Sequence, residues 1–359
     1  MRDIIICTVG ISVVENLRGL GWSLSNTIQV AKRLHDEIDP TDKRCGAEIN
    51  STRSIIQKRI IETARSLHLC ISDTADGDKA GDILKQYFNR QFDAIEKHRI
   101  EGLNDRDFKE FKNTGLRNLA RKIAGLVRAE RQRGSEPIIN ATGGFKAQMA
   151  FAALLGQVLC VPVYYQFEDF PEIIELPPLP VRFDYGLCLE PDNFQILYKL
   201  QRENTLSVDE INLNRLSPRL AVLIEREEDC CALSTLGELI LDEAVRYSIE
   251  RAAIYLSSRS VKTYEKLDST QRERIDNHLA KLRDPELRTQ NLHSRFEGRE
   301  IDCACYKQPN TTERIFYYVA GQADVFVCEI FTDHESYERF IEKNSILPAC
   351  YSNFSKHNL

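Results

Sequence analysis

The sequence predicts an α/β protein of several domains, the first of which is a Rossmann-like, doubly wound domain. A strand-like apolar run, IIICTVG, lies at residues 4–10, and a strand–turn–helix–strand series occupies residues 136–167. Apolar strands that alternate with helices are typical of a parallel sheet covered by helices on both faces. In addition, 359 residues exceed what one hydrophobic core usually supports.

The chain divides into three predicted segments, 1–180, 181–255 and 256–359. The first closes at residues 170–180, which hold four of the twelve prolines and therefore predict an extended linker. Its expected elements, besides the strands above, are a helix from about 24 to 39, strand ends at 45–50 and 67–72, and a charged amphipathic stretch at 80–133.

The middle segment, 181–255, predicts a winged helix-turn-helix-like connector. A helix from Pro218, a turn at 227–229, the strand-like CCAL and a helix capped by Ser234 or Thr235 follow one another. Such a module binds DNA or serves as a spacer or dimerisation module. Acidic residues dominate between residues 217 and 250, and this favours the spacer or dimerisation role.

The last segment, 256–359, predicts an α+β domain. We expect a helix over 261–282 and then, after Pro285, an antiparallel sheet with strands at 299–306, 314–320 and 323–330, closed by a helix at 335–343. The pair Gly321-Gln322 between the last two strands is a hairpin signal.

Composition favours a cytoplasmic protein with no membrane span, no metal and no cofactor. The eleven cysteines form no CxxC pair and no regular framework, so we interpret them as reduced, apolar side chains. No apolar run approaches the roughly 20 residues of a membrane-spanning helix. The net charge is −6, and residues 258–359 carry 15 Lys and Arg against 16 Asp and Glu, so any nuclease there must concentrate its positive charge locally.

A phosphate-binding loop is predicted at ATGGFK, residues 141–146, between a strand and a helix. Its glycines allow close backbone approach at a helix N-terminus, and Lys146 can neutralise a phosphate. The Walker A spacing is missing, which disfavours ATP hydrolysis. The loops TVGISVVEN and EINSTRS supply further polar groups. The candidate ligand-binding residues are Thr8, Gly10, Ser12, Asn16, Asn50, Ser51, Thr142, Gly143, Gly144 and Lys146.

The TVGxS loop, the ATGGFK loop and the proline-rich exit of the first 180 residues resemble the CARF domains of type III CRISPR systems. The resemblance implies a homodimer that binds a cyclic oligoadenylate, most commonly cyclic tetra-adenylate, across its two-fold axis. By position, Ser12 and Lys146 would contact the ring phosphates. Some members of this family also cleave their ligand slowly, and the same two residues would be suspected of that ring nuclease activity.

The last 100 residues are similar to RelE-type toxins, which are mRNA interferases. KLRDPELR, Tyr306-Lys307, RIFYYV and HESYERF carry this resemblance. It implies a metal-independent endoribonuclease that acts on mRNA in the ribosomal A site by 2′-OH attack. Such chemistry needs a base, an acid and cations around the phosphate.

Four residues are assigned catalytic roles on this basis. Arg314 stands where the family keeps a phosphate-binding arginine, and Lys307 ends the preceding strand. His334 is a candidate acid or base, because histidine titrates near neutral pH, and Tyr337 can stack on a base. Each has an ordinary alternative: Arg314 and Lys307 as surface charges, His334 as a helix N-terminal residue and Tyr337 as a core aromatic. The candidate RNA-binding residues are Arg288, His293 and Arg295.

Two other interpretations were weighed. Arg288–His293 and Arg272–His278 match the RxxxxH-type spacing of HEPN ribonucleases, but that motif belongs to an all-helical domain and the strands expected here disfavour it. The second interpretation is a transcriptional regulator, in which a CARF sensor controls a DNA-binding winged helix and the RelE-like domain is inactive. The favoured interpretation remains a ligand-activated antiviral ribonuclease whose partners are the ribosome and mRNA.

Overall fold

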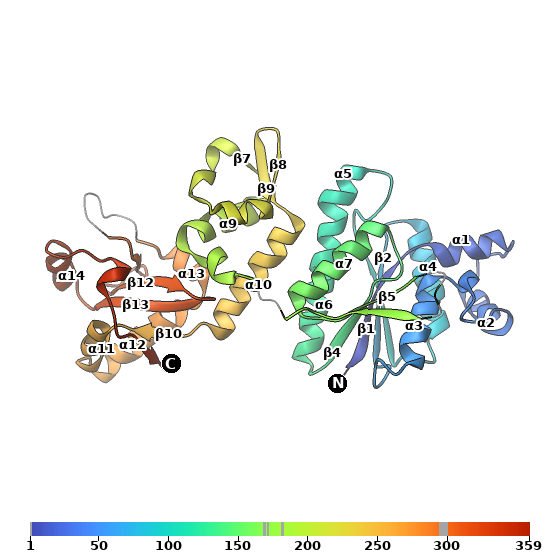
Figure 1. Cartoon of the computed structure of the whole chain (residues 1–359), viewed down its shortest axis with the longest axis horizontal. Helices are drawn as coiled ribbons and strands as arrows, with labels where there is room; N and C mark the ends of the chain where they lie inside the picture. The colour runs from blue at the N-terminus through green and yellow to red at the C-terminus, as the bar shows by residue number, and fades with distance from the viewer. Residues whose placement is uncertain (1, 168–169, 171, 181–182, 294–300) are drawn as a thin grey trace. The chain divides into compact units, whose positions relative to one another are not determined.

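The chain forms two compact units, residues 1–181 and 182–359, in a computed structural model that describes residues 2–167, 170, 172–180, 183–293 and 301–359 (Figure 1). The unit boundary follows the proline-rich stretch. Each unit has its own sheets and its own core, and each is described by itself.

The N-terminal unit is built on a six-stranded sheet of order β3-β2-β1-β4-β5-β6, in which the first five strands are parallel and β6 is antiparallel (Figure 1). This confirms the predicted α/β class with parallel strands. Its strands are β1 (Arg2–Val9), β2 (Ser66–Ile71), β3 (Ala94–Arg99), β4 (Glu136–Asn140), β5 (Val163–Gln166) and β6 (Ile173–Leu176). Its helices are α1 (Ser12–Gly19), α2 (Thr27–Glu37), α3 (Ala47–Gln57), α4 (Ala75–Phe88), α5 (Phe108–Glu110), α6 (Leu116–Gln132) and α7 (Lys146–Leu159).

Both faces of this sheet are covered, because successive side chains of a strand point to opposite faces. Ile5 and Cys7 of β1 and Leu69 of β2 pack into one core with the apolar sides of α1, α2 and α4. On the other face, His68 of β2 lies against α6. Strand β1 is buried from its second residue onward, as its continuous apolar run predicted.

Two predicted features of this unit are wrong. Residues 45–50, expected as a strand end, belong to a 3-10 turn (Lys43–Cys45) and to α3, because Gly46 at φ 96° reverses the chain and the residues after it are buried with helical spacing. Strand β3 is hidden within the charged stretch 80–133, since an edge strand with half-exposed faces lacks a clear apolar pattern.

The C-terminal unit contains a three-stranded sheet of order β7-β9-β8 and a five-stranded sheet of order β11-β12-β13-β10-β14. Its strands are β7 (Leu206–Ser207), β8 (Ile224–Glu227), β9 (Cys230–Leu233), β10 (Ile254–Leu256), β11 (Ala304–Tyr306), β12 (Arg314–Ala320), β13 (Asp324–Phe331) and β14 (Ser355–His357). Its helices are α8 (Tyr185–Leu189), α9 (Pro191–Glu203), α10 (Thr235–Arg251), α11 (Ser258–Glu265), α12 (Ser269–Lys281), α13 (Pro285–Gln290) and α14 (His334–Ile341).

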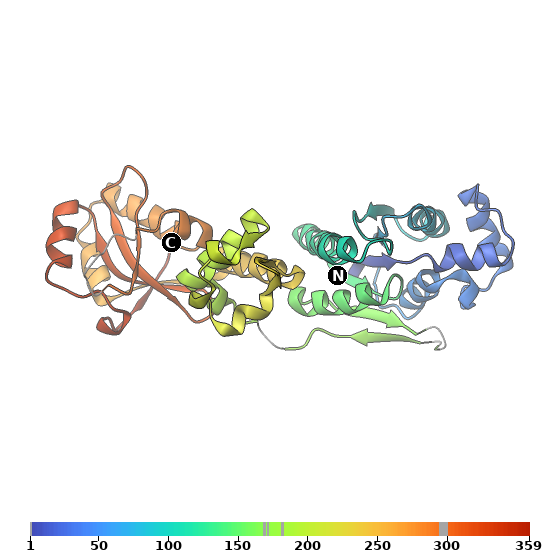
Figure 2. The same ribbon diagram turned by 90° about the horizontal axis from the view of Figure 1, so that it is seen from above.

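The five-stranded sheet has a core on each face. Ile275 and Leu279 of α12 pack on one face, and Tyr337 and Ile341 of α14 pack on the other. The hairpin β12–β13, its turn at Gly321 and the closing helix were predicted and are confirmed. Seen from above in Figure 2, α11, α12 and α14 flank the long strands of this sheet.

Three details of the C-terminal unit differ from the prediction. Strand β10 pairs in parallel with β13, so the five-stranded sheet is mixed and the expected boundary at residues 255 and 256 falls inside one of its strands. The helix expected over 261–282 breaks, because Asp268 caps a new helix, α12. Residues 218–223 form a 3-10 helix instead of an α-helix.

The strand-like CCAL is β9, which pairs with β8 in an antiparallel hairpin, and Ser234 caps α10 as expected. None of the helices among the described residues is both long and apolar enough to cross a bilayer.

Replacing Gly186 with alanine is expected to destabilise the C-terminal unit. A Cβ on Gly186 would lie 1.9 Å from the main-chain oxygen of Gly321, so α8 and the β12–β13 turn would have to separate. Overpacking of this kind costs about 1–3 kcal/mol. Denaturant unfolding of Gly186→Ala measures the loss. The control is Gly125→Ala on α6, where a Cβ meets no atom and alanine favours the helix. A Gly186→Ala protein as stable as the wild type would contradict this packing.

Candidate functional site

A cavity of about 630 Å³ opens in the N-terminal unit where β1, β4 and β5 end. The chain order reverses between β1 and β4, and ligands of open α/β sheets bind at such a switch point. The cavity is lined by Ser12, Glu15, Asn16, Pro40, Thr41, Lys43, Arg44, Ala47, Asn50, Arg53, Ser54, Gln57, Thr142, Gln166, Phe167 and Phe170.

The loops after β1 and β4 touch each other at one end of this cavity, through glycines and over a buried carboxyl group. A Cβ on Gly10 would lie 2.7 Å from the Gly144 main-chain nitrogen, and one on Gly143 would lie 1.9 Å from Oε1 of Glu48. The Gly10 N–H donates to Glu48 Oε1 at 2.6 Å, and Thr8 Oγ1 donates to the Gly143 oxygen at 2.6 Å. These glycines therefore let the two loops meet, and the Gly10 N–H is already used inside the protein.

A buried hydrogen-bond network holds the end of β4 against α3 and β5. Asn140 Nδ2 donates to Ser51 Oγ at 2.8 Å, and Thr142 Oγ1 donates to Asn140 Oδ1 at 2.7 Å. The Gln166 N–H in turn donates to Thr142 Oγ1 at 3.1 Å. Ser51 is fully buried, so its hydroxyl belongs to this network and not to the cavity.

The opposite wall of the cavity is a turn held by polar side chains of α1 and α3. Asn16 Nδ2 donates to the Lys43 main-chain oxygen at 3.0 Å, and Asn50 Nδ2 donates to two main-chain oxygens in residues 40–42 at 2.5 and 3.0 Å. Ser12 Oγ accepts the N–H of the first residue of α3 at 3.3 Å. These side chains fix residues 40–47 in place.

The strongest ligand-binding groups of the cavity were not predicted. Three cations line it, Lys43, Arg44 and Arg53, together with the rings of Phe167 and Phe170, which are 42% and 55% exposed. Nε of Arg53 is buried and has no partner among the described residues. Cations bind phosphates and exposed aromatic rings stack on bases. Phe167 and Phe170 follow β5, Lys43 and Arg44 lie in a 3-10 turn, and Arg53 lies within α3, so the five share no sequence signal.

The ten predicted ligand residues fall into three groups. Ser12, Asn16, Asn50 and Thr142 line the cavity. Those that hold its loops together are Thr8, Gly10, Ser51, Gly143 and Gly144. Lys146 is exposed at the start of α7 and lies outside the lining. The expected N–H groups at this helix start are partly occupied, because the Phe145 N–H donates to Gln148 Oε1 at 2.5 Å.

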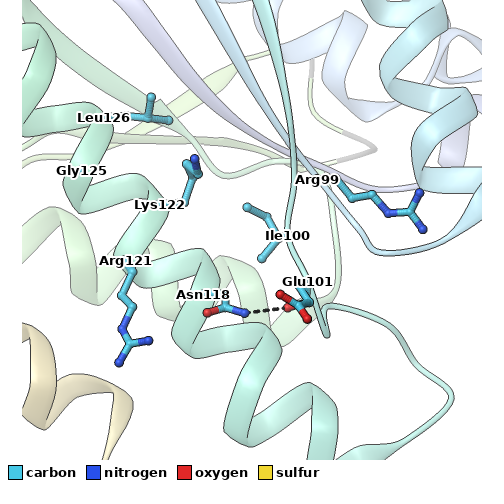
Figure 3. A pocket seen from close by; sticks show the side chains of 8 residues that line it. All are labelled: Arg99, Ile100, Glu101, Asn118, Arg121, Lys122, Gly125 and Leu126. Carbon is cyan, nitrogen blue, oxygen red and sulfur yellow. Dashed lines mark hydrogen bonds between the residues drawn. The ribbon is translucent and has the colours of Figure 1, made fainter. Parts of the chain in front are cut away.

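A second cavity, of about 430 Å³, lies between the end of β3 and α6 (Figure 3). Arg99 and Glu101 line one side, and Asn118, Arg121 and Lys122 line the other. Asn118 Nδ2 donates to the Glu101 main-chain oxygen at 3.0 Å, which ties the two sides together. No aromatic ring lines it, so it is less suited to a nucleotide than the cavity at the switch point.

In the C-terminal unit, three of the four predicted catalytic residues touch in a row from core to surface. The Arg314 guanidinium lies 5.6 Å from the centre of the Tyr337 ring, and the His334 ring lies 5.7 Å from the same ring. Arg314 is 4% exposed and its Nη1 donates to three main-chain oxygens in residues 311–313, while Tyr337 is 3% exposed. Only His334, with 62% of its side chain exposed, reaches the surface.

This arrangement corrects the expected site. Arg314 does not present a free guanidinium to a phosphate, because the backbone of residues 311–313 occupies it, and Tyr337 is a core aromatic. Lys307 directly follows β11, and the pairing of Tyr306 with Ile315 places its backbone beside the start of β12, where Arg314 lies.

Two of the three predicted RNA-binding residues lie within the described part of the chain, and neither is fully exposed. Arg288 is 4% exposed, its Nη1 donates to the Leu282 main-chain oxygen at 3.0 Å, and burial lowers the pKa of its guanidinium. His293 is half-buried, and its N–H donates to the Cys305 oxygen at 2.8 Å. Arg295 lies outside the described residues.

The N-terminal unit is thus an α/β unit with a cationic and aromatic cavity at its switch point. Residues 43–179, which include most of this cavity and less than half of the chain, match the family described as CRISPR-associated protein (Cas_APE2256). The matched segment is therefore similar to a CRISPR-associated family.

Two solved structures are similar over most of the chain. One is the protein VC1899 from Vibrio cholerae, with 10% identity, 90% of this chain and 79% of that chain covered, and a TM-score of 0.28. The other is Can2 from Sulfobacillus thermosulfidooxidans, solved in complex with cyclic tetra-adenylate, with 12% identity, 91% and 79% coverage, and a TM-score of 0.26. TM-scores this low do not establish a shared fold.

Replacing Glu48 with glutamine is expected to stabilise the N-terminal unit at neutral pH. Burial raises the pKa of the Glu48 carboxyl in the folded state. As the pH rises, the carboxyl therefore loses its proton in the unfolded state before it does so in the folded state. Stability therefore falls from the ordinary glutamate pKa upward to the raised one. Glutamine keeps the acceptor for Gly10 and removes this loss, so the difference in stability between Glu48→Gln and wild type should grow above about pH 4.3. Thermal unfolding from pH 4 to pH 8 measures it, and a constant difference would contradict the raised pKa.

Proposed function

We propose that the N-terminal unit is a CARF-type sensor that binds a cyclic oligoadenylate in the cavity at the switch point. The observation that carries this proposal is the pairing of Lys43, Arg44 and Arg53 with the exposed rings of Phe167 and Phe170 around one cavity. A cyclic oligoadenylate carries both phosphates and flat bases. The cations can bind the phosphates, and the aromatic rings can stack on the bases. The likeness of residues 43–179 to a CRISPR-associated family supports the same role in type III CRISPR defence.

We further propose that two copies share one cyclic tetra-adenylate. A cavity of about 630 Å³ has the size that encloses a drug-sized ligand, and a ring of four nucleotides is larger than that. A symmetric ring can lie on the two-fold axis of a homodimer so that each protomer binds half of it. If the dimer has two arrangements, the ligand shifts the population toward the one that it binds more tightly. This shift in population can transmit the signal.

Arg53→Ala is expected to weaken binding of cyclic tetra-adenylate by roughly 10–100-fold, because a charge-assisted hydrogen bond contributes about 1.5–3 kcal/mol. Calorimetric titration of the full-length protein measures the affinity. Lys32→Ala on the exposed side of α2 removes the same charge away from the cavity and should bind as the wild type does. Equal affinity of Arg53→Ala and Lys32→Ala would contradict the placement of the ligand. Lys146→Ala reports whether the phosphates also reach the start of α7.

For the C-terminal unit we propose the output activity, a metal-independent endoribonuclease that cleaves mRNA on the ribosome. The support is a mixed sheet flanked by α11 and α12 on one side and α14 on the other, with His334, Tyr337, Arg314 and Lys307 gathered at one end of it. Because Arg314 and Tyr337 are buried, we propose that this is the resting arrangement and that ligand binding shifts α14 to expose them. The near-neutral charge of this segment agrees with substrate positioning by the ribosome.

Cleavage of mRNA in purified translating ribosomes is expected only when cyclic tetra-adenylate is present. His334→Gln should reduce the rate by about 10²–10⁴-fold, the usual contribution of a general acid or base, with ligand binding unchanged. Arg339→Gln is the matched control, since it removes an exposed cation from the same helix. Cleavage at the wild-type rate in His334→Gln would remove that residue from the mechanism. Ligand binding without cleavage under any condition would end the ribonuclease proposal, and sequence-specific DNA binding would then support the transcriptional regulator.

A further inference from the structure

We propose that His68, Glu96 and His98 bind a divalent transition-metal ion of the zinc class. His68 lies on β2, and Glu96 and His98 lie two residues apart on the neighbouring edge strand β3. In the parallel register His68 is opposite Glu96, and Cys70 is opposite His98, so the three ligand side chains project from the same face of the sheet. This site is independent of the proposed ligand cavity and of the ribonuclease.

The spacing of the three ligand atoms suits a metal ion. His68 Nδ1 lies 3.1 Å from His98 Nε2, and Glu96 Oε2 lies 3.8 Å from each of these nitrogens. A point equidistant from the three atoms is about 2.1 Å from each, which is the bond length of zinc to imidazole nitrogen and carboxylate oxygen. Small side-chain rotations would lift the ion out of the plane of the three atoms and open a fourth coordination position.

A buried carboxylate, which also pairs with Arg133, lies behind His68. Glu130 Oε1 on α6 lies 3.6 Å from His68 Nε2, the ring nitrogen that faces away from the proposed ion. Both side chains are 2% exposed, and His68 Nε2 and Glu130 Oε2 have no hydrogen-bond partner among the described residues. Metal-binding histidines usually direct their second nitrogen to a carboxylate, which fixes the tautomer and leaves the other nitrogen's lone pair for the ion.

The charges around the site allow a cation. Burial lowers the pKa of His68 and lowers that of His98 to about 4, so the imidazoles are neutral ligands at pH 7. The nearby Lys122 and Arg133 oppose a cation, whereas Glu96 and Glu130 favour one. Without a metal, the two uncharged imidazoles contact each other. Glu96 Oε2 then lies 3.8 Å from His68 Nδ1 and from His98 Nε2, too far for a hydrogen bond to either.

The role that this geometry fits is a clamp on the edge strand. Three protein ligands leave a fourth position for water, and the 58% exposed Glu96 side chain opens that position to solvent. The ion would tie β3 to β2 through side chains, at a strand that has no neighbour on its outer side. Binding to the folded state alone stabilises that state in proportion to the logarithm of metal concentration.

The experiment uses the full-length protein, stripped of metal by a chelator, with its exposed thiols Cys160, Cys230 and Cys350 alkylated so that they cannot bind the probe. Titration with Zn²⁺ should show one ion per chain and raise the thermal midpoint of unfolding by roughly 5 °C at saturation. Titration with Co²⁺ should give the visible absorption of a four-coordinate site with nitrogen and oxygen ligands.

Two variants decide between this site and adventitious binding. Glu96→Gln changes an exposed side chain without disturbing the core and should weaken Zn²⁺ affinity roughly 10–100-fold or more, and His98→Gln should do the same. Glu62→Gln, an exposed glutamate of the same unit, is the matched control and should bind like the wild type. Absence of stoichiometric binding after alkylation, or equal affinity in Glu96→Gln, His98→Gln and Glu62→Gln, would overturn the proposal.

Discussion

The architecture of the N-terminal unit depends on a contact between two loops that only glycine permits. Gly10 after β1 and Gly143 and Gly144 after β4 meet over the Glu48 carboxyl, at distances that leave no room for a Cβ. This contact closes one end of the switch point and leaves the cavity open on the side of α1, α3 and β5. Burying the Glu48 carboxyl lowers the stability of the folded state at neutral pH. An apolar side chain at this position would avoid that cost but could not accept the Gly10 N–H.

The two candidate sites differ in the exposure of their cationic side chains. In the N-terminal unit the cations Lys43 and Arg44 are exposed at the cavity, with Arg44 paired to the Asp42 carboxylate at 2.6 Å. Asn16 and Asn50 hydrogen-bond the backbone beneath them. In the C-terminal unit the Arg314 guanidinium is buried and its charge is dispersed over main-chain oxygens. A buried charge is tolerated only when it is hydrogen-bonded in this way. The two sites therefore differ in whether their cations can be reached from solvent.

The sequence predicted the elements that have a strong local pattern and missed the features that depend on tertiary packing. Strand β1, the ATGGFK turn and the hairpin β12–β13 were predictable because apolar runs and glycine turns act locally. Strand β3 and helix α3 were missed, since a charged edge strand and a helix after a glycine reversal carry weak local patterns. Burial of Arg314 and Tyr337 depends on tertiary packing, which leaves no motif in the sequence. The same holds for the convergence of Arg53 with Phe167, which lie more than 100 positions apart.

The central claim is that the cavity between the ends of β1 and β4 is the ligand site. Hydrogen exchange of the full-length protein, with and without cyclic tetra-adenylate, tests it most directly. We expect slower exchange in the ligand-bound protein at residues 10–16, 40–57 and 142–146, the segments that line and support the cavity. Unchanged exchange across all three segments at a ligand concentration that saturates binding would contradict it.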